Sequence, residues 1–370
     1  MVTIAYPNHA RGVRDNVVAI TIRDVARRAH VSVATVSRAL AEPQLLREQT
    51  RKRVLAAAEQ LAYRPNPAAR SLITGKTGNI GIIVPDLDNP FYPSVLRGVQ
   101  ARAHQSGYAV LLADSGEDPA AEENLVHTMG KQVDGVIVCA PFASDAQLAR
   151  IARMTTLVLV NRRLSGIPAV LMDVARGMRQ AIGHLAALGH HRLAYLSGPR
   201  QAWSNRERRR GLLAAARSHR IQLVELGPFE PKFEGGIEAA DLAVNTGATA
   251  LVAYNDMMAL GALRRLVARG IRVPEDVSLV GFDDILYAAM CAPPLTTVAM
   301  PMEAAGRAAV DLLLHQWGDV PPSADAQLHQ KLASTLIIRA TTAKPALAQR
   351  ASAGRSAAGP RARKRSPGQE

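Results

Sequence analysis

Hydrophobic residues recur at helical spacing in three short segments near the start of the chain. Thr21, followed three residues later by Asp24, is typical of a helix start, because a hydroxyl and a carboxylate there can cap free backbone groups. Ser32 is placed to cap a second helix over residues 33–40, and a third is predicted over residues 49–61. The tight break between the first two helices predicts a helix-turn-helix unit.

From residue 80 onward, apolar runs of strand length alternate with amphipathic segments of helix length. Such alternation is typical of a parallel sheet with helices on both faces. The stretch is too long for one typical sheet domain, so we expect an α/β core of two lobes, with a ligand at the carboxyl ends of the strands. The predicted strands are 80–84, 109–112, 135–138, 157–160, 170–172, 193–196, 250–253 and 278–281.

Positive charge is concentrated at the two ends of the chain. With 45 basic and 31 acidic residues, the formal net charge is +14. Residues 20–80 hold 11 Lys or Arg and 4 Asp or Glu, residues 340–370 hold 7 and 1, and residues 81–339 balance at 25 of each. This distribution favours a polyanion partner for the ends and a different task for the middle.

Composition excludes several classes of protein. No apolar run is long enough for a membrane-spanning helix, and residues 1–20 lack the apolar stretch of a secretory signal, so we expect a cytoplasmic protein. Two cysteines, Cys139 and Cys291, are too few for a disulfide scaffold or a four-cysteine zinc site. We expect neither a cofactor nor a metal.

We find no set of catalytic motifs and do not expect an enzyme. Gly75-Lys76-Thr77 resembles the end of a phosphate-binding loop, but Arg70 stands where that loop needs a glycine. Two alternatives stay open at this point. A periplasmic transport protein would suit the core but not the basic helical start. A nucleic-acid enzyme regulated by a small molecule would be favoured by turnover of DNA or sugar.

Several segments carry a family resemblance. Residues 21–29 (TIRDVARRA) and 31–38 (VSVATVSR) closely resemble the DNA-binding segment of the lac repressor and purine repressor family. The likeness continues in the same order over roughly residues 21–340, through IGIIVP, DNPF, YND, PEDVS and VGFD. This family consists of dimeric or tetrameric transcription regulators with a helix-turn-helix headpiece, a hinge helix and a two-lobed core like that of periplasmic sugar-binding proteins.

The resemblance implies a domain plan for the chain. We expect an extension over 1–19, a helix-turn-helix DNA-binding domain over 20–64, a hinge helix and linker over 65–78, a core over 79–340 and a basic, disordered tail over 341–370. Within the core we expect an N-lobe of residues 79–171 and 299–328 and a C-lobe of residues 172–296 and 330–340. The tail lacks apolar heptads, so it does not predict a tetramer.

Resemblance also assigns DNA contacts to the second helix, which lies in the major groove in such proteins. Arg38 would grip a guanine through O6 and N7, while Val33 and Ala34 would offer apolar contact, for instance to a thymine methyl. Leu72 would wedge into the minor groove after a hinge helix too short to be stable alone. A solvated arginine and ordinary core packing are the structural alternatives. The expected DNA-binding residues are Thr21, Ser32, Val33, Ala34, Thr35, Ser37, Arg38, Arg51, Tyr63, Asn66, Ala69, Arg70 and Leu72.

Motif matching places a second set of residues where family members contact an effector. Arg208 would donate two hydrogen bonds to ligand oxygens, and Asp283 would accept from hydroxyls. Many family members carry Asp where Asn161 stands, so ligand specificity should differ here. Core packing is an equal alternative for Phe229. The expected effector-binding residues are Phe91, Tyr92, Asn161, Ser204, Arg208, Phe229, Asn255 and Asp283.

Together these features predict a homodimeric, sequence-specific transcription regulator that acts as a repressor rather than as an activator. A small molecule between the lobes, a sugar or sugar derivative, would control its operator affinity. The expected partners are palindromic double-stranded operator DNA, this effector and a second copy of the chain, with no membrane.

Overall fold

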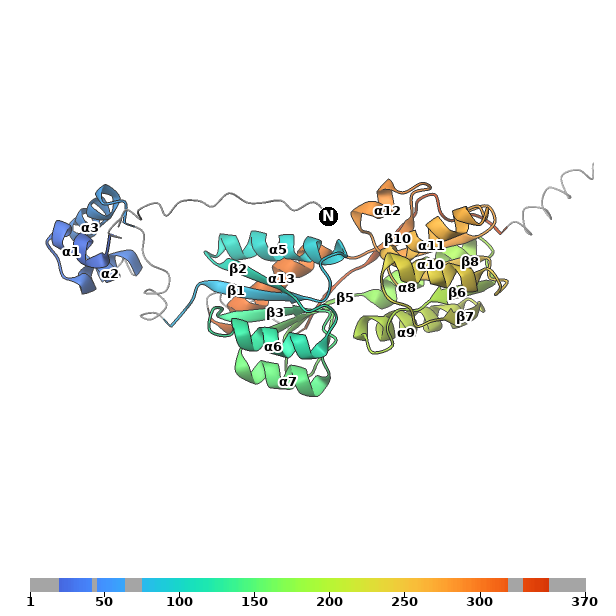
Figure 1. Cartoon of the computed structure of the whole chain (residues 1–370), viewed down its shortest axis with the longest axis horizontal. Helices are drawn as coiled ribbons and strands as arrows, with labels where there is room; N and C mark the ends of the chain where they lie inside the picture. Colours follow the sequence, from blue (N-terminus) through green and yellow to red (C-terminus); the bar gives the residue numbers. More distant parts are fainter. Residues whose placement is uncertain (1–19, 42–44, 64–74, 319–328, 346–370) are drawn as a thin grey trace, which may run out of the picture. The chain divides into compact units, whose positions relative to one another are not determined.

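The computed structural model describes residues 20–41, 45–63, 75–318 and 329–345. They form two compact units, divided after Thr77 (Figure 1). Each unit is considered by itself. No helix among the described residues is long and apolar enough to cross a membrane.

The first unit contains three helices, α1 (Ile22–Ala29), α2 (Val33–Ala41) and α3 (Glu48–Gln60). Each contributes apolar side chains to one small core, in which Val25, Val36 and Val54 are fully buried. Because a core of this size is shared by three short helices, none of them is expected to be stable alone. The predicted helix-turn-helix unit is confirmed.

Local side-chain contacts cap the starts of α1 and α2, and His30 forms the turn between them. The backbone N–H and the hydroxyl of Thr21 both donate to Asp24, at 2.9 and 2.7 Å, and Ser32 Oγ accepts from the N–H of Thr35 at 3.1 Å. His30 ends α1 with a φ of 51°. This left-handed conformation reverses the chain direction within a few residues and is uncommon outside glycine.

The N-lobe of the second unit is built on a parallel sheet in the order β11-β5-β4-β3-β1-β2. Its central strands are buried almost throughout, as a parallel sheet covered on both faces requires. The strands are β1 (Asn79–Val84), β2 (Ala109–Asp114), β3 (Gly135–Cys139), β4 (Thr156–Val160), β5 (Ala169–Met172) and β11 (His329–Leu332).

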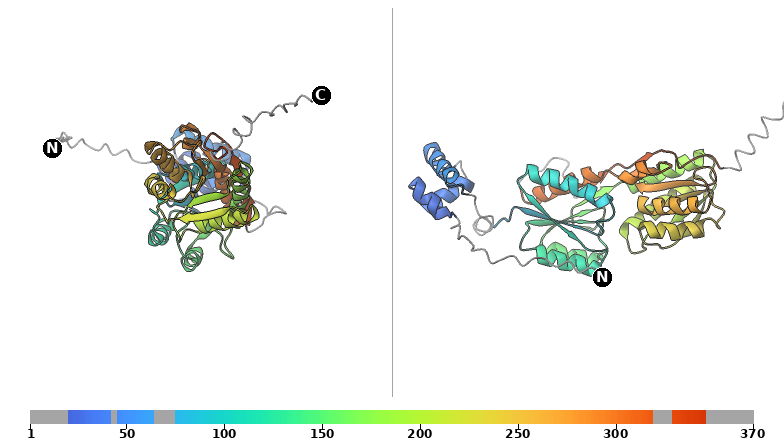
Figure 2. Two further views of the ribbon diagram at one scale, coloured as in Figure 1. Left: turned by 90° about the vertical axis from the view of Figure 1, so that its right-hand side faces the viewer. Right: turned by 45° about the horizontal axis from the view of Figure 1, so that its top comes forward.

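Two pairs of helices cover this sheet, one pair on each face (Figures 1 and 2). Helices α5 (Phe91–Gln105) and α13 (Met302–Gln316) pack against each other on one face. Helices α6 (Pro119–Met129) and α7 (Asp145–Met154) cover the other face over a separate apolar cluster. The alternation of strands and helices thus gives the layered α/β lobe that the sequence predicts.

The C-lobe repeats this plan with the strand order β12-β10-β9-β8-β6-β7, in which β12 alone of the described strands runs antiparallel to its neighbour. Helices α8 (Val174–Ala187) and α9 (Trp203–Ser218) pack together, as do α10 (Phe233–Ala243) and α11 (Asp256–Ala268). The short helix α12 (Leu286–Met290) follows β9. The strands are β6 (Arg192–Leu196), β7 (Gln222–Leu226), β8 (Ala250–Ala253), β9 (Ser278–Asp283), β10 (Thr296–Ala299) and β12 (Thr335–Ile337).

Glycines bring the helices of two pairs into backbone contact. A Cβ added to Gly98 on α5 or to Gly306 on α13 would lie 2.1 or 2.2 Å from a carbonyl oxygen of the opposing helix. In the C-lobe, a Cβ on Gly236 of α10 or Gly261 of α11 would lie 2.0 or 1.9 Å from one. These distances leave no room for a side chain. In each lobe, the close packing of one helix pair therefore depends on glycine at these positions.

Four short strands were not predicted, and their sequences explain why. β7, β11 and β12 lie at sheet edges, where a continuous apolar run is not needed. β10 reads Thr-Thr-Val-Ala, although Thr296 and Thr297 are both fully buried. Threonine does not count as apolar in a hydropathy pattern. A buried strand whose hydroxyl groups form hydrogen bonds inside the fold therefore does not show up as an apolar run.

Two expected boundaries differ from the structure. β11 pairs with β5, so residues 330–332 belong to the N-lobe sheet and not to the C-lobe. Residues 341–345 extend the C-lobe instead of starting the tail, because Thr341 is fully buried and exchanges hydrogen bonds of 2.7 Å with Leu279. The extension 1–19, the hinge helix over 65–74 and the tail from 346 lie outside the described residues.

Candidate functional site

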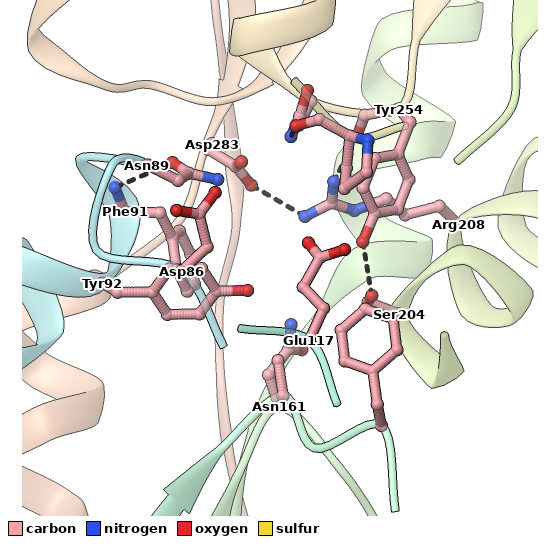
Figure 3. Close-up of a pocket in the computed structure, with 14 residues that line it drawn as sticks. Asp86, Asn89, Phe91, Tyr92, Glu117, Asn161, Ser204, Arg208, Tyr254 and Asp283 are labelled. Carbon is pink, nitrogen blue, oxygen red and sulfur yellow. Dashed lines mark hydrogen bonds and ion pairs between the residues drawn. The ribbon is translucent and has the colours of Figure 1, made fainter. Parts of the chain in front are cut away.

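A pocket lies between the two lobes, at the carboxyl ends of their parallel strands (Figure 3). Each lobe contributes polar and aromatic side chains that face one another across a cavity of about 20 Å³. Such a cavity holds about one water molecule. The lining residues are Asp86, Asn89, Phe91, Tyr92, Glu117, Ala140, Phe142 and Asn161 from the N-lobe, and Ser204, Arg208, Pro231, Tyr254, Asn255 and Asp283 from the C-lobe.

Four lining residues hold the backbone in the left-handed region without being glycine. Glu117, Ala140, Asn161 and Asp283 have φ angles of 63, 43, 57 and 124°. The first three follow β2, β3 and β4, and Asp283 ends β9. Such conformations cost free energy and cluster where a fold fixes side chains for a ligand. The sharp turns aim these residues into the pocket.

A buried ion pair joins α9 to the end of β9. Arg208 Nη2 lies 2.7 Å from Asp283 Oδ1, and each side chain is 4% exposed. Burial raises the pKa of the Asp283 carboxyl, and the guanidinium of Arg208 opposes that rise. Arg208 Nη1 also donates to the carbonyl oxygen of Tyr254. Its guanidinium carbon lies 4.5 Å from the ring centre of Tyr254 and 4.2 Å from that of Phe282.

Two buried polar atoms of the pocket have no hydrogen-bond partner among the described residues. They are Oδ1 of Asn161 and Nε of Arg208. Both residues are 3% exposed. An unsatisfied buried polar group costs about 1–3 kcal/mol. A ligand that donates to Asn161 and accepts from Arg208 would remove this cost.

Other polar and aromatic residues are fixed by local bonds. The hydroxyl oxygens of Ser204 and Tyr254 lie 2.7 Å apart. The rings of Phe91 and Tyr92 pack edge to face, with their centres 5.1 Å apart. Asn255 caps α11 by accepting from the N–H of Met258 at 2.9 Å, and its amide donates to the carbonyl of Pro231 at 2.7 Å. Asn255 therefore closes the C-lobe wall, with one amide N–H left for a ligand.

Tyr92 keeps its phenolic proton. Burial is the largest cause that raises the pKa of Tyr92 well above its usual value, with Tyr254 and Asp283 adding to the rise. The hydroxyl of Tyr92 is consequently available as a hydrogen-bond donor to a ligand.

Seven of the eight expected effector residues line this one pocket, and Phe229 does not. Phe229 is half-buried and packs against the apolar cluster of the C-lobe. Sequence reasoning missed other lining residues, among them Asp86, Glu117, Phe142 and Tyr254. Glu117 and Phe142 lie just beyond the ends of β2 and β3, so counting polar and aromatic residues after each predicted strand would have found them.

In the first unit, the expected base-contacting residues lie on an open part of α2. Val33 is 41% exposed, and Ala34 and Arg38 are also exposed. Ser37 is half-buried, and the hydroxyl of Thr35 lies 2.9 Å from that of Ser32. The start of α2 therefore presents side chains that the three-helix core does not use.

The remaining expected DNA-binding residues fall into two groups. Thr21 caps α1, Arg51 is half-buried on α3, and Tyr63 packs against the three-helix core. Asn66, Ala69, Arg70 and Leu72 lie outside the described residues.

Comparison with known proteins gives this arrangement a family. Residues 21–66 match bacterial regulatory proteins of the lacI family, and residues 182–342 match the periplasmic binding protein-like domain. The chain is 35% identical over 310 residues to the HTH-type transcriptional repressor CytR of Escherichia coli K12, covering 80% of this chain and 90% of CytR. The chain belongs to the lacI family of bacterial regulatory proteins.

Other family members agree in sequence and in fold. The HTH-type transcriptional regulator GalS of Salmonella typhimurium is 36% identical over 80% of this chain and 89% of its own. The lac repressor dimer bound to operator and the anti-inducer ONPF matches with a TM-score of 0.78 at 29% identity, over 88% of this chain and 99% of that one. The regulator CelR in complex with cellobiose matches with a TM-score of 0.64 at 28% identity, over 87% and 99%.

Membership fixes the class of activity. As a lacI-family protein, the chain is a ligand-controlled, DNA-binding transcriptional regulator and not an enzyme. The helix-turn-helix unit and the two-lobed core are the two parts of that design. No group of three or more His, Cys, Asp or Glu side chains in the described part of the chain is arranged to hold a metal ion.

Proposed function

We propose that this protein is a repressor that binds a palindromic operator as a homodimer and changes its operator affinity when a sugar-like effector enters the pocket between its lobes. The observation that carries the proposal is the polar chemistry of that pocket. Asn161 Oδ1 is buried without a partner at the junction of the lobes, beside a wall of fixed hydroxyl and carboxylate groups. Polyhydroxylated ligands satisfy such groups with several directed hydrogen bonds.

Pocket size supports a coupling between ligand binding and lobe movement. A cavity of about 20 Å³ cannot admit a hexose, whose atoms occupy many times the volume of one water molecule. A sugar must therefore bind while the lobes are further apart. A ligand that prefers one lobe spacing shifts the population of core conformations by its differential affinity for them. CelR, a relative of similar fold, is known in complex with cellobiose.

DNA binding is assigned to the exposed start of α2. Arg38 is exposed and has no ion pair among the described residues, so its guanidinium is free to bind a guanine edge. The neighbouring side chains of Val33 and Ala34 are short enough to let the helix approach the bases. A relative of the same fold binds operator DNA as a dimer.

An apolar groove on the C-lobe is suited to the second copy of the chain. Leu286 and Met290 of α12 are each 69% exposed, Val267 on α11 is 53% exposed and Tyr287 is 48% exposed. Val267, Tyr287 and Met290 line a groove of about 540 Å³ whose walls are almost entirely apolar, and Leu286 precedes Tyr287 on α12. Exposed apolar surface of this kind is typical of a protein–protein interface. Two copies related by a two-fold axis would match a palindromic operator.

Ligand screening on the full chain tests the proposal. Neutral sugars, amino sugars and nucleosides are screened by thermal shift, and each ligand that raises the melting temperature is then tested for its effect on operator affinity. We expect at least one to change the affinity, and Asn161→Ala to abolish its binding. The matched control, Asn245→Ala at an exposed position just after α10, should bind normally. An Asn161→Ala protein with an unchanged response would overturn the assignment of the pocket.

A further inference from the structure

Charges that line the pocket do not balance. The charged lining residues are Arg208 and Asp283, which neutralise each other at 2.7 Å, and two further acids, Asp86 and Glu117. Neither Asp86 nor Glu117 forms an ion pair within the described residues. Asp86 Oδ1 accepts the backbone N–H of Asp88 at 2.9 Å. The pocket therefore carries an excess of two carboxylates, both half-buried.

These carboxylates are directed at the space where a ligand would sit. Figure 3 shows Asp86 and Glu117 turned into the pocket, opposite the guanidinium of Arg208. The left-handed backbone of Glu117, with a φ of 63°, turns its side chain inward just after β2. This is an unusual conformation for a residue that would otherwise be a solvated surface acid.

Independent of the acids, the pocket holds an unfilled acceptor and aromatic faces. Asn161 Oδ1 is buried and lacks a donor. Tyr92, Phe142 and Tyr254 supply aromatic rings to the walls. A positively charged group is attracted to the faces of such rings as well as to carboxylates. Arg208, held over the rings of Tyr254 and Phe282, already uses this interaction in the wall itself.

Closure of the lobes raises the free-energy cost of the two unpaired carboxylates. Two carboxylates that lose water without gaining a partner destabilise the closed state. Burial is the largest cause that raises the pKa of Glu117, and the charge of Asp86 raises it further. From the neighbouring elements, Lys232 lowers this pKa while Glu230 and Asp114 raise it, so the surroundings remain acidic. An anionic ligand would add to the repulsion, whereas a cation would relieve it.

We propose that the effector of this pocket is a polyhydroxylated molecule bearing a protonated amine, such as an amino sugar, whose ammonium group binds Asp86 and Glu117. Its hydroxyls donate to Asn161 and accept from Arg208 and Tyr92. Sugar phosphates and sugar acids are excluded by the same two carboxylates. This inference rests on the proposed function, because it names the ligand class of the same site.

Matched ligand sets test the charge requirement. Isothermal titration of the full chain compares glucosamine, galactosamine and mannosamine with the parent hexoses and with their 6-phosphates. We expect at least one amino sugar to bind at least about tenfold more tightly than its parent hexose, and the phosphates not to bind. Tighter binding by a neutral hexose or a phosphate overturns the proposal, as does the absence of binding by all three amines at millimolar concentration.

Substitutions separate charge from shape. Glu117→Gln keeps the size of the side chain and should weaken the amino sugar at least about tenfold while leaving a neutral hexose unchanged. The control Glu238→Gln removes an exposed carboxylate on α10 and should change neither. Equal affinity of parent and Glu117→Gln for the amine overturns the proposal. If a neutral sugar changes operator affinity instead, the ligand class is wrong but the proposed function stands. If no duplex is preferred at all, the proposed function itself fails.

Discussion

Arg208 and Asp283 form an ion pair of 2.7 Å that ties α9 to the end of β9, with both side chains 4% exposed. The pair shapes the C-lobe wall of the pocket, and together with the bond from Nη1 to the carbonyl oxygen of Tyr254 it uses two of the five N–H groups of the guanidinium. A role for Arg208 in ligand binding is therefore inseparable from its role in holding the wall.

Removing one partner should cost more than removing both. Arg208→Leu leaves a buried carboxylate unpaired, and we expect a loss of about 3–5 kcal/mol in the free energy of unfolding at neutral pH. Asp283→Asn in the same chain removes the stranded charge, so the double variant should recover part of that loss. Urea unfolding of the parent, both single variants and the double variant measures the coupling. Strictly additive losses would show that the two residues do not act as a pair.

Arg38 should set base preference rather than general affinity. Arg38→Ala is expected to weaken binding to the preferred operator by about 1–3 kcal/mol and to relax the preference at one base position per half-site. Lys52→Ala serves as the control, because Lys52 is exposed and pairs with Glu48 at 2.8 Å on α3. Binding to a library of single-base operator variants measures both the operator affinity and the base preference at each position. A uniform loss across the library would make Arg38 a phosphate contact instead.

Close helix contact in the N-lobe predicts a strong effect of one methyl group. In Gly306→Ala the new Cβ would lie 2.2 Å from the carbonyl oxygen of Val95, so α5 and α13 must separate. We expect a loss of about 1–3 kcal/mol or more in the free energy of unfolding. In the control Gly183→Ala the Cβ meets only the end of His219, at 3.7 Å, and the higher helix propensity of alanine should stabilise α8 slightly. Equal effects of the two changes on the urea midpoint would refute the packing account.

Asp256 should make the stability of the C-lobe depend on pH. Its side chain is fully buried, and burial is the largest cause that raises its pKa to about 6, opposed by hydrogen bonds from Thr297 at 2.6 Å and Ile285 at 2.9 Å. The folded pKa exceeds the unfolded one, so the stabilising contribution is complete below about pH 4 and is lost as the pH rises through about 6.

Asp256→Asn removes this titration. The melting temperature of the parent, measured against that of the variant, should fall as the pH rises from about 4 to 7. The neighbouring acid Asp284 raises the same pKa and is retained in both proteins, so it does not account for the difference. A difference in melting temperature that is constant over this range would contradict the assignment.

Exposed leucine and methionine on α12 should hold the dimer together. Leu286→Glu combined with Met290→Glu places two charges in the proposed C-lobe interface, and we expect sedimentation velocity to show a shift from dimer to monomer. Leu242→Glu on α10 is the control, because Leu242 is 53% exposed but lies outside both α12 and the lining of the groove. A dimer that survives the double substitution would place the interface elsewhere.

Much of the fold could be read from sequence because it is encoded locally. Thr21 with Asp24 and Ser32 with Thr35 are caps formed within one helical turn, and the buried central strands are continuous apolar runs. β10 could not be read this way, because Thr296 and Thr297 are buried through bonds to Thr341 and Asp256, far away in the chain.

The pocket was predictable in part. Seven expected residues line it. The match to family motifs predicted them, and the carboxyl ends of the strands in the two sheets bring them together between the lobes. Glu117 was missed because its inward direction depends on a left-handed turn after β2, which no apolar pattern reveals. Phe229 was expected in the pocket, yet its ring packs against the C-lobe cluster, a choice that depends on tertiary contacts.

The central claim is that a ligand between the lobes controls the affinity with which α2 binds a specific duplex. Fluorescence anisotropy of the full chain on its selected palindrome and on a scrambled duplex, over a range of salt and with and without the bound effector, tests it most directly. The account predicts a preference of about 10³-fold or more for the palindrome, steep salt dependence on both duplexes and an effector-dependent change in the palindrome affinity alone. Equal affinity for the two duplexes, or a palindrome affinity that no pocket ligand alters, would contradict it.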